Sequence, residues 1–237
     1  MSHKPSKSSL RLLVLAAVMA LGTIASTSTA EAQSRPGRVA AAKPAANAKV
    51  VAAKKAMVKE FSVKPHANLQ RKIGNKPLLH ISNTKGKAYE KHLDHSVELV
   101  FKPIGRTGHS YLRVGRKIYD HAFGARVNDF RSPTSGAYGF VMSATPKQIE
   151  TLQAGFNQLM SQNPKFSMTG TGHNNTFSCA GFISYVMKNH APELGVSLTP
   201  SAIGIASRLM RGQAEAVTVY GGQSSALADG SFQFQKL

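Results

Sequence analysis

The sequence predicts an α+β fold in which a small antiparallel sheet packs against helices and a disordered basic segment precedes the sheet. Two observations predict this class. Three β-like runs follow one another between residues 96 and 124 and are separated by Gly-containing turns, which is typical of an antiparallel meander. Apolar residues then recur at helical spacing in three later stretches. With 42% hydrophobic residues, the 237-residue chain can bury a core.

Residues 1–32 have the order of a secretory signal peptide. Basic residues precede the apolar run LLVLAAVMALG, and small residues follow it up to Ala32. The run is too short for a membrane-spanning helix, which needs about 20 apolar residues. We therefore expect cleavage before Gln33 and a soluble mature protein that is secreted or periplasmic.

Residues 33–92 carry most of the positive charge. They hold 14 Lys and Arg against Glu60 and Glu90, in a chain whose formal net charge is +19. Prolines interrupt the Ala- and Lys-rich stretch 34–56, which shows no apolar stripe, so we expect a mostly disordered linker. Such a basic segment can adhere to anionic polymers or to a membrane surface. No aromatic interleaving supports specific nucleic-acid recognition.

The domain expected over residues 93–237 begins with the predicted strands, which cover 96–103, 109–115 and 116–124. Each alternates apolar and polar residues, as a strand with one buried face does. A longer loop follows and ends in a short strand before residue 145.

Three helices are predicted next, at 145–163, 179–190 and 198–210. Thr145 and Thr199 are the expected caps of the first and third, because each precedes a proline that suits the first helical position. The run 217–222 is β-like, and a loose tail is expected after it.

Cys179 is the only cysteine of the chain. In an exported protein a single cysteine indicates either an intermolecular bridge or a free thiol with a function, although a buried inert thiol is the alternative. Cys179 starts a predicted helix, where free N–H groups and the helix dipole stabilise a thiolate and could also bind an oxyanion. It is therefore the candidate nucleophile.

His109 and His121 are the candidate partners of this thiol. They lie on consecutive predicted strands on either side of the turn at Gly115, so a hairpin brings them close together. His109 would take the thiol proton, and His121 would hold the imidazole of His109 in place. Asp120, next to His121, is the rival for this second role.

The remaining histidine motifs do not predict a functional site. His173 lies six residues before the thiol in a Gly-containing stretch and is interpreted as a loop residue. His92 and His95 have metal-like spacing, but no second pair of ligands completes a zinc site. We therefore expect no metal and no cofactor. Phosphate-loop and nucleophile-elbow patterns are not present in the sequence.

The stretches GHSYLRVGRKIYDH (108–121) and FSCAGFISYVM (177–187) together resemble the circularly permuted branch of the NlpC-type papain-like cysteine hydrolases, which includes the lecithin:retinol acyltransferase group. In that branch the strand histidine precedes the helix cysteine, as His109 and Cys179 do here. The resemblance covers about residues 93–210. Members often carry Asn directly before the Cys, where this chain has Ser178.

The resemblance implies a permuted papain-like fold and a thiol-dependent hydrolase, a peptidase or amidase, with Cys179, His109 and His121 as catalytic residues. Export and the basic segment favour cell-wall peptides as the substrate. Two alternatives stay open: a lipid acyl hydrolase or acyltransferase that uses the same residues, and a non-catalytic exported binding protein of the same fold. We expect a monomer.

Overall fold

The computed structural model describes residues 48–82, 84–104, 107–131 and 136–221, all within one compact unit. The signal peptide predicted for residues 1–32 and the loose tail predicted after residue 222 lie outside the described residues.

One large sheet organises the described residues. Its strands are β1 (Ser62–Val63), β2 (Leu78–Ile81), β3 (Ser96–Lys102), β4 (His109–Val114), β5 (Lys117–His121), β6 (Ala125–Asp129), β7 (Ala137–Ser143) and β10 (Ala216–Tyr220). They lie in the order β1-β2-β10-β7-β3-β4-β5-β6. Only β2 and β10 are parallel neighbours, and all other neighbours are antiparallel. The α+β class is confirmed, but the prediction of a small sheet is wrong, because eight strands take part.

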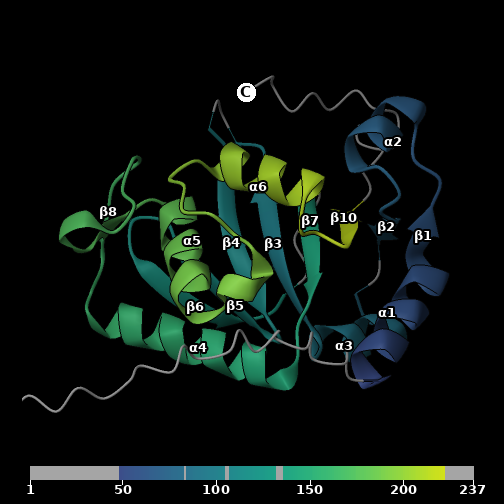
Figure 1. Cartoon of the computed structure of the whole chain (residues 1–237), viewed down its shortest axis with the longest axis horizontal. Coiled ribbons are helices and arrows are strands. Elements are labelled where there is room, and N and C mark those ends of the chain that lie inside the picture. Colours follow the sequence, from purple (N-terminus) through teal and green to yellow (C-terminus); the bar gives the residue numbers. More distant parts are fainter. Residues whose placement is uncertain (1–47, 83, 105–106, 132–135, 222–237) are drawn as a thin grey trace, which may run out of the picture. The chain divides into compact units, whose positions relative to one another are not determined.

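Helices cover both faces of this sheet (Figure 1). Among the described residues they are α1 (Ala48–Phe61), α2 (Ala67–Ile73), α3 (Lys87–Leu93), α4 (Pro146–Ser161), α5 (Cys179–His190) and α6 (Ala202–Arg211). The helices α4, α5 and α6 pack on one face, with α2 beside α6, and α1 and α3 pack on the other. None of the helices in the described ranges has the length and hydropathy needed to cross a membrane. Two further short strands, β8 (Lys165–Phe166) and β9 (Thr176–Phe177), pair with each other.

Alternation along β3 explains why there are two cores. Val97, Leu99 and Phe101 point to the core under α4, α5 and α6, whereas Val100 joins the core under α1 and α3. Successive side chains of a strand point to opposite faces, so a strand covered on both sides is apolar throughout. The charged Glu98 in the middle of this buried strand is therefore an exception that needs partners.

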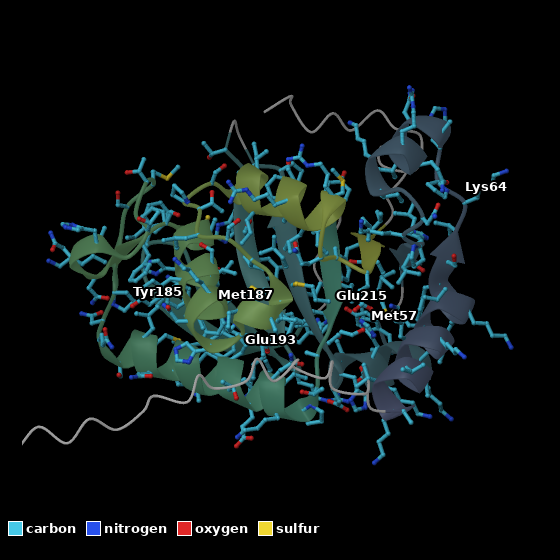
Figure 2. The ribbon with its side chains drawn as sticks, in the orientation of Figure 1. Met57, Lys64, Tyr185, Met187, Glu193 and Glu215 are labelled. Carbon is cyan, nitrogen blue, oxygen red and sulfur yellow. The ribbon has the colours of Figure 1, made fainter. Side chains whose placement is uncertain are left out.

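Residues 48–92 differ from the mostly disordered linker predicted for them, because they form α1, β1, α2, β2 and α3. The helix α1 buries Val50, Ala53 and Met57, a narrow stripe that its many alanines and lysines hide in the sequence. Met57 lies against the sheet, whereas Lys64 points outward from the fold (Figure 2). The strand β2 finds its partner in β10, far along the chain. Local sequence patterns could not show that pairing.

The predicted strands 96–103, 109–115 and 116–124 are confirmed as β3, β4 and β5, and the helix predicted from Thr145 is confirmed as α4 with a complete capping box. Two details were wrong. The stretch expected as a longer loop that ends in one short strand holds β6 as well as the expected strand, β7. The cap of α6 is Ser201 and not Thr199, whose hydroxyl instead accepts a hydrogen bond from the Ser201 N–H.

Candidate active site

Cys179 is the first residue of α5, as predicted. Ser178 caps the helix, because its hydroxyl oxygen accepts a hydrogen bond from the Gly181 N–H at 2.9 Å and donates one to the Pro200 carbonyl at 2.7 Å. The side chain of Ser178 therefore anchors the helix start. Cys179 is 9% exposed and belongs to the core under α4, α5 and α6.

Two glycines fix the loop before the thiol. The Ser178 N–H donates to the Gly170 carbonyl at 2.8 Å. A Cβ on Gly181 would lie 2.0 Å from that same carbonyl oxygen, and a Cβ on Gly170 would lie 2.7 Å from the backbone of Phe177. Only glycine fits at either position, and the loop can therefore lie directly against the first turn of α5.

His109, the first residue of β4, is hydrogen-bonded through its imidazole to the thiol of Cys179. Its Nε2 lies 2.9 Å from Oδ1 of Asp120, so Nδ1 is the nitrogen left for the thiol. The two side chains form an ion pair when the imidazole is protonated. The three side chains thus form a nucleophile, a base and a carboxylate in series.

The pKa values of the pair shift in opposite directions. Burial raises the pKa of the Cys179 thiol, but hydrogen bonds from His109 and from the backbone N–H groups of Ser110 and Ala180 outweigh burial, and the pKa falls below its ordinary value. Burial lowers the pKa of His109, but its contacts with Asp120 and Cys179 outweigh burial and raise it to about 9. Both shifts favour a thiolate beside an imidazolium at neutral pH.

His121 lies on the other face of β5 and does not reach His109. It is fully buried, with its ring centroid 5.5 Å from that of Phe166 and 5.0 Å from that of Phe182. Its Nε2 is 3.2 Å from the carbonyl oxygen of Lys165. The structure therefore places Asp120, and not His121, at the second nitrogen of His109. Consecutive strand residues face opposite sides, so only one of these two neighbours could do so.

The remaining predicted candidates lie apart from the thiol. His173 is exposed in a short 3₁₀ turn, His173–Asn175, within the loop before β9. His92 is buried, and burial together with the charge of Arg113 lowers its pKa to about 3. Within the described ranges, no group of three His, Cys, Asp or Glu side chains is placed to hold a metal ion.

A second polar cluster, which the sequence analysis missed, lies inside the sheet. The Arg113 Nε donates to Oε2 of Glu98 at 3.0 Å, and both side chains are fully buried. The Tyr220 hydroxyl lies 2.7 Å from each Glu98 oxygen, and Thr218 also donates to this carboxylate. The signal in the sequence was a charged residue among the apolar residues of each of two neighbouring strands, Glu98 in β3 and Arg113 in β4.

Comparison of the chain with protein-family models, with curated proteins and with solved structures found no match. A thiol at a helix start, a histidine within hydrogen-bond reach and a carboxylate that orients the histidine are the three groups that nucleophilic acyl chemistry needs. The Cys179 N–H belongs to the first turn of α5, where N–H groups have no intrahelical acceptor, so it can donate to an oxyanion.

Proposed function

We propose that this protein is an exported cysteine hydrolase that cleaves an amide bond through an acyl-enzyme. One observation carries the proposal: the Cys179 thiol is hydrogen-bonded to His109, whose other ring nitrogen contacts Asp120 at 2.9 Å. A merely structural cysteine needs neither a basic partner nor a carboxylate behind that partner.

In the first step the thiolate of Cys179 attacks the amide carbon, and a C–S bond forms. The Cys179 N–H stabilises the oxyanion. The imidazolium of His109 then donates its proton to the nitrogen as the C–N bond breaks, and the amine leaves a thioester behind.

In the second step His109 takes a proton from water as the water oxygen attacks the thioester carbon. The C–S bond breaks, the acid leaves, and the thiolate and imidazolium are restored. Asp120 keeps the imidazole in one orientation throughout and stabilises its charged form. Asp120 thus takes the role expected of His121.

The resemblance of residues 108–121 and 177–187 to the permuted papain-like hydrolases supports the same chemistry, since the histidine strand precedes the cysteine helix in both. Ser178 has no part in the proposed reaction, because its hydroxyl is occupied in capping α5 and holding Pro200. The signal sequence expected at residues 1–32 and the many lysines before residue 93 favour a peptide of the cell wall as the substrate.

The test is to offer the purified chain and its Cys179→Ala form a panel of cell-wall peptides and phospholipids, with the products identified by mass spectrometry. We expect peptide cleavage by the native chain and none by Cys179→Ala, whose fold is checked by circular dichroism. A thiol-dependent product from phospholipids alone would replace the amidase with the lipid acyl hydrolase or acyltransferase. A thiol inert to iodoacetamide, with no product from either class, would leave the non-catalytic binding protein.

A further inference from the structure

Three large apolar side chains of the described residues stand out by their exposure. Phe123 is 88% exposed, and Ile104 and Met168 are each 60% exposed, while the next in rank, Val127, reaches only 42%. Single exposed apolar residues need no explanation, but a group of them on one part of a surface marks an interaction site. Ile104, Phe123 and Met168 mark such a site only if they lie near one another on the surface.

Ile104 and Phe123 lie at the end of the sheet that carries His109 and Asp120. Lys102, at the end of β3, pairs with His109, so the loop that contains Ile104 leads directly to the base. The Gly108 N–H closes this loop on the Ile104 carbonyl at 3.0 Å. Phe123 is at the tip of the hairpin between β5 and β6, three residues after Asp120.

Met168 lies near the same end of the sheet, beside the start of α5. It lies on the loop 167–170, which is tied at both ends to the residues before the thiol. The Ser167 N–H donates to the Phe177 carbonyl at 2.9 Å, and the Gly170 carbonyl accepts from Ser178. The ring of Phe166, directly before this loop, lies 5.1 Å from the ring of Phe123. The hairpin tip and the loop are therefore in contact beside the start of α5.

Phe123 is also held in a backbone conformation that few large residues adopt, with φ at 59°. Glycine or asparagine would fit this turn with less strain. A phenylalanine at this position strains the backbone of the turn, and it leaves a large apolar ring exposed to water. A role in binding accounts for it better than packing does.

We propose that Ile104, Phe123 and Met168 form an apolar rim that binds a large apolar side chain of a peptide, next to the amide that Cys179 attacks. The proposal rests on the proposed function only in taking a peptide amide as the bond that is cleaved; it replaces the cell-wall peptide with a peptide that carries a large apolar side chain. A strand edge next to the rim favours a peptide over a lipid. In the described residues β6 is an edge strand of the sheet. It begins at Ala125, two residues after Phe123. An extended peptide can pair with an open strand edge while its side chains fill neighbouring sites.

The test uses peptide chloromethyl ketones, in which the thiolate displaces chloride and forms a C–S bond. Two probes differ only in the side chain beside the reactive carbon, which is benzyl in one and hydrogen in the other. Labelling needs a reactive thiol and binding but no turnover, so this test can succeed even where hydrolysis is not found. The variants are Phe123→Ser, Met168→Ser and, as a matched control, Val63→Ser. Val63 is 38% exposed on β1, at the opposite end of the strand order.

We expect the native chain to react about tenfold faster with the benzyl probe, a typical value for an apolar contact in specificity. Phe123→Ser and Met168→Ser should lose this preference, whereas Val63→Ser should keep both the preference and the native rate with iodoacetamide. Equal rates of the native chain with the two probes would overturn the rim, as would a preference that survives in both rim variants. Faster labelling by a long-chain acyl chloromethyl ketone than by the benzyl peptide would overturn the peptide as its occupant.

Discussion

Two charged clusters share the strand β4, and they differ in how completely their polar groups are satisfied. Inside the sheet, Arg113 and Glu98 are fully buried and hydrogen-bonded on every side. At the end of the sheet, the side chains of His109 and Asp120 are 22% and 27% exposed; they contact each other, and His109 also contacts the thiol of Cys179. A fully satisfied cluster holds its charges fixed, whereas a partly satisfied one can exchange a proton. The first therefore suits structure and the second suits catalysis.

The inner cluster shows how tightly its charges are held. Arg113 also donates to the Ser96 hydroxyl at 2.8 Å and to the Gly115 carbonyl at 2.9 Å. Burial, with the charge of Glu98 added, raises the pKa of Tyr220, which keeps its phenol protonated and able to donate to the carboxylate. A Cβ on Gly139 would lie 1.8 Å from Oε1 of Glu98, so the neighbouring strand is also shaped around this carboxylate.

Breaking the inner cluster should have the largest effect on stability. Arg113→Met leaves Glu98 buried without its cation, and we expect the free energy of unfolding to fall by about 3–5 kcal/mol. Urea denaturation followed by circular dichroism measures this loss. The control is Arg116→Met, because Arg116 pairs with Glu90 and Asp94 at the surface. That loss should stay below about 1 kcal/mol. Similar losses in the two variants would show that the buried partners of Arg113 stabilise the fold no more than the surface partners of Arg116 do.

Asp120→Asn should affect catalysis and leave stability nearly unchanged. The amide cannot stabilise the imidazolium of His109, and we expect kcat/KM to fall by about 100-fold. Because His109 has a raised pKa of about 9, activity in the native chain should decline as the pH rises through about 9. In Asp120→Asn this decline should move to lower pH. Asp129→Asn, which removes an exposed partner of Lys117, is the control and should leave the pH profile in place. A profile unchanged by Asp120→Asn would exclude Asp120 as the orienting group.

His121→Phe should have the smallest effect of the three. The new ring keeps the contacts with Phe166 and Phe182 and loses only the hydrogen bond to the Lys165 carbonyl. We expect a loss of about 1 kcal/mol in stability and little change in kcat/KM, measured on the same substrate as for Asp120→Asn. If His121→Phe lowered kcat/KM as much as Asp120→Asn, the role would return to the histidine and the contrast between the two faces of β5 would fail.

The sequence predicted the parts of the site that depend on local patterns. The hairpin around Gly115 follows from alternation and a glycine turn, and the helix start at Cys179 follows from apolar spacing. The choice between Asp120 and His121 could not be predicted, because a shift of one residue reverses every side chain of a strand. That choice depends on the pairing of β4 with β5 and on where α5 packs.

The size of the sheet could not be predicted for a different reason. β2 has its partner in β10, and α1 gains its stability from the sheet and α3 more than from its own sequence. From its local sequence alone, the Lys-rich segment 33–92 is therefore interpreted as a linker, because the pairing of β2 with β10 is not visible there. The Glu98–Arg113 pair is likewise visible only once β3 and β4 are placed in register.

The place of β10 has a consequence for the order of folding. This strand lies between β2 and β7, although it is the last strand in the described chain. During synthesis, β2 has no neighbour on that side until residues 216–220 have left the ribosome, so the sheet cannot be completed before β10 has been made. Long-range pairing of this kind folds slowly. The strands and the helix that carry Cys179, His109 and Asp120 are therefore made before the sheet can be joined through β10.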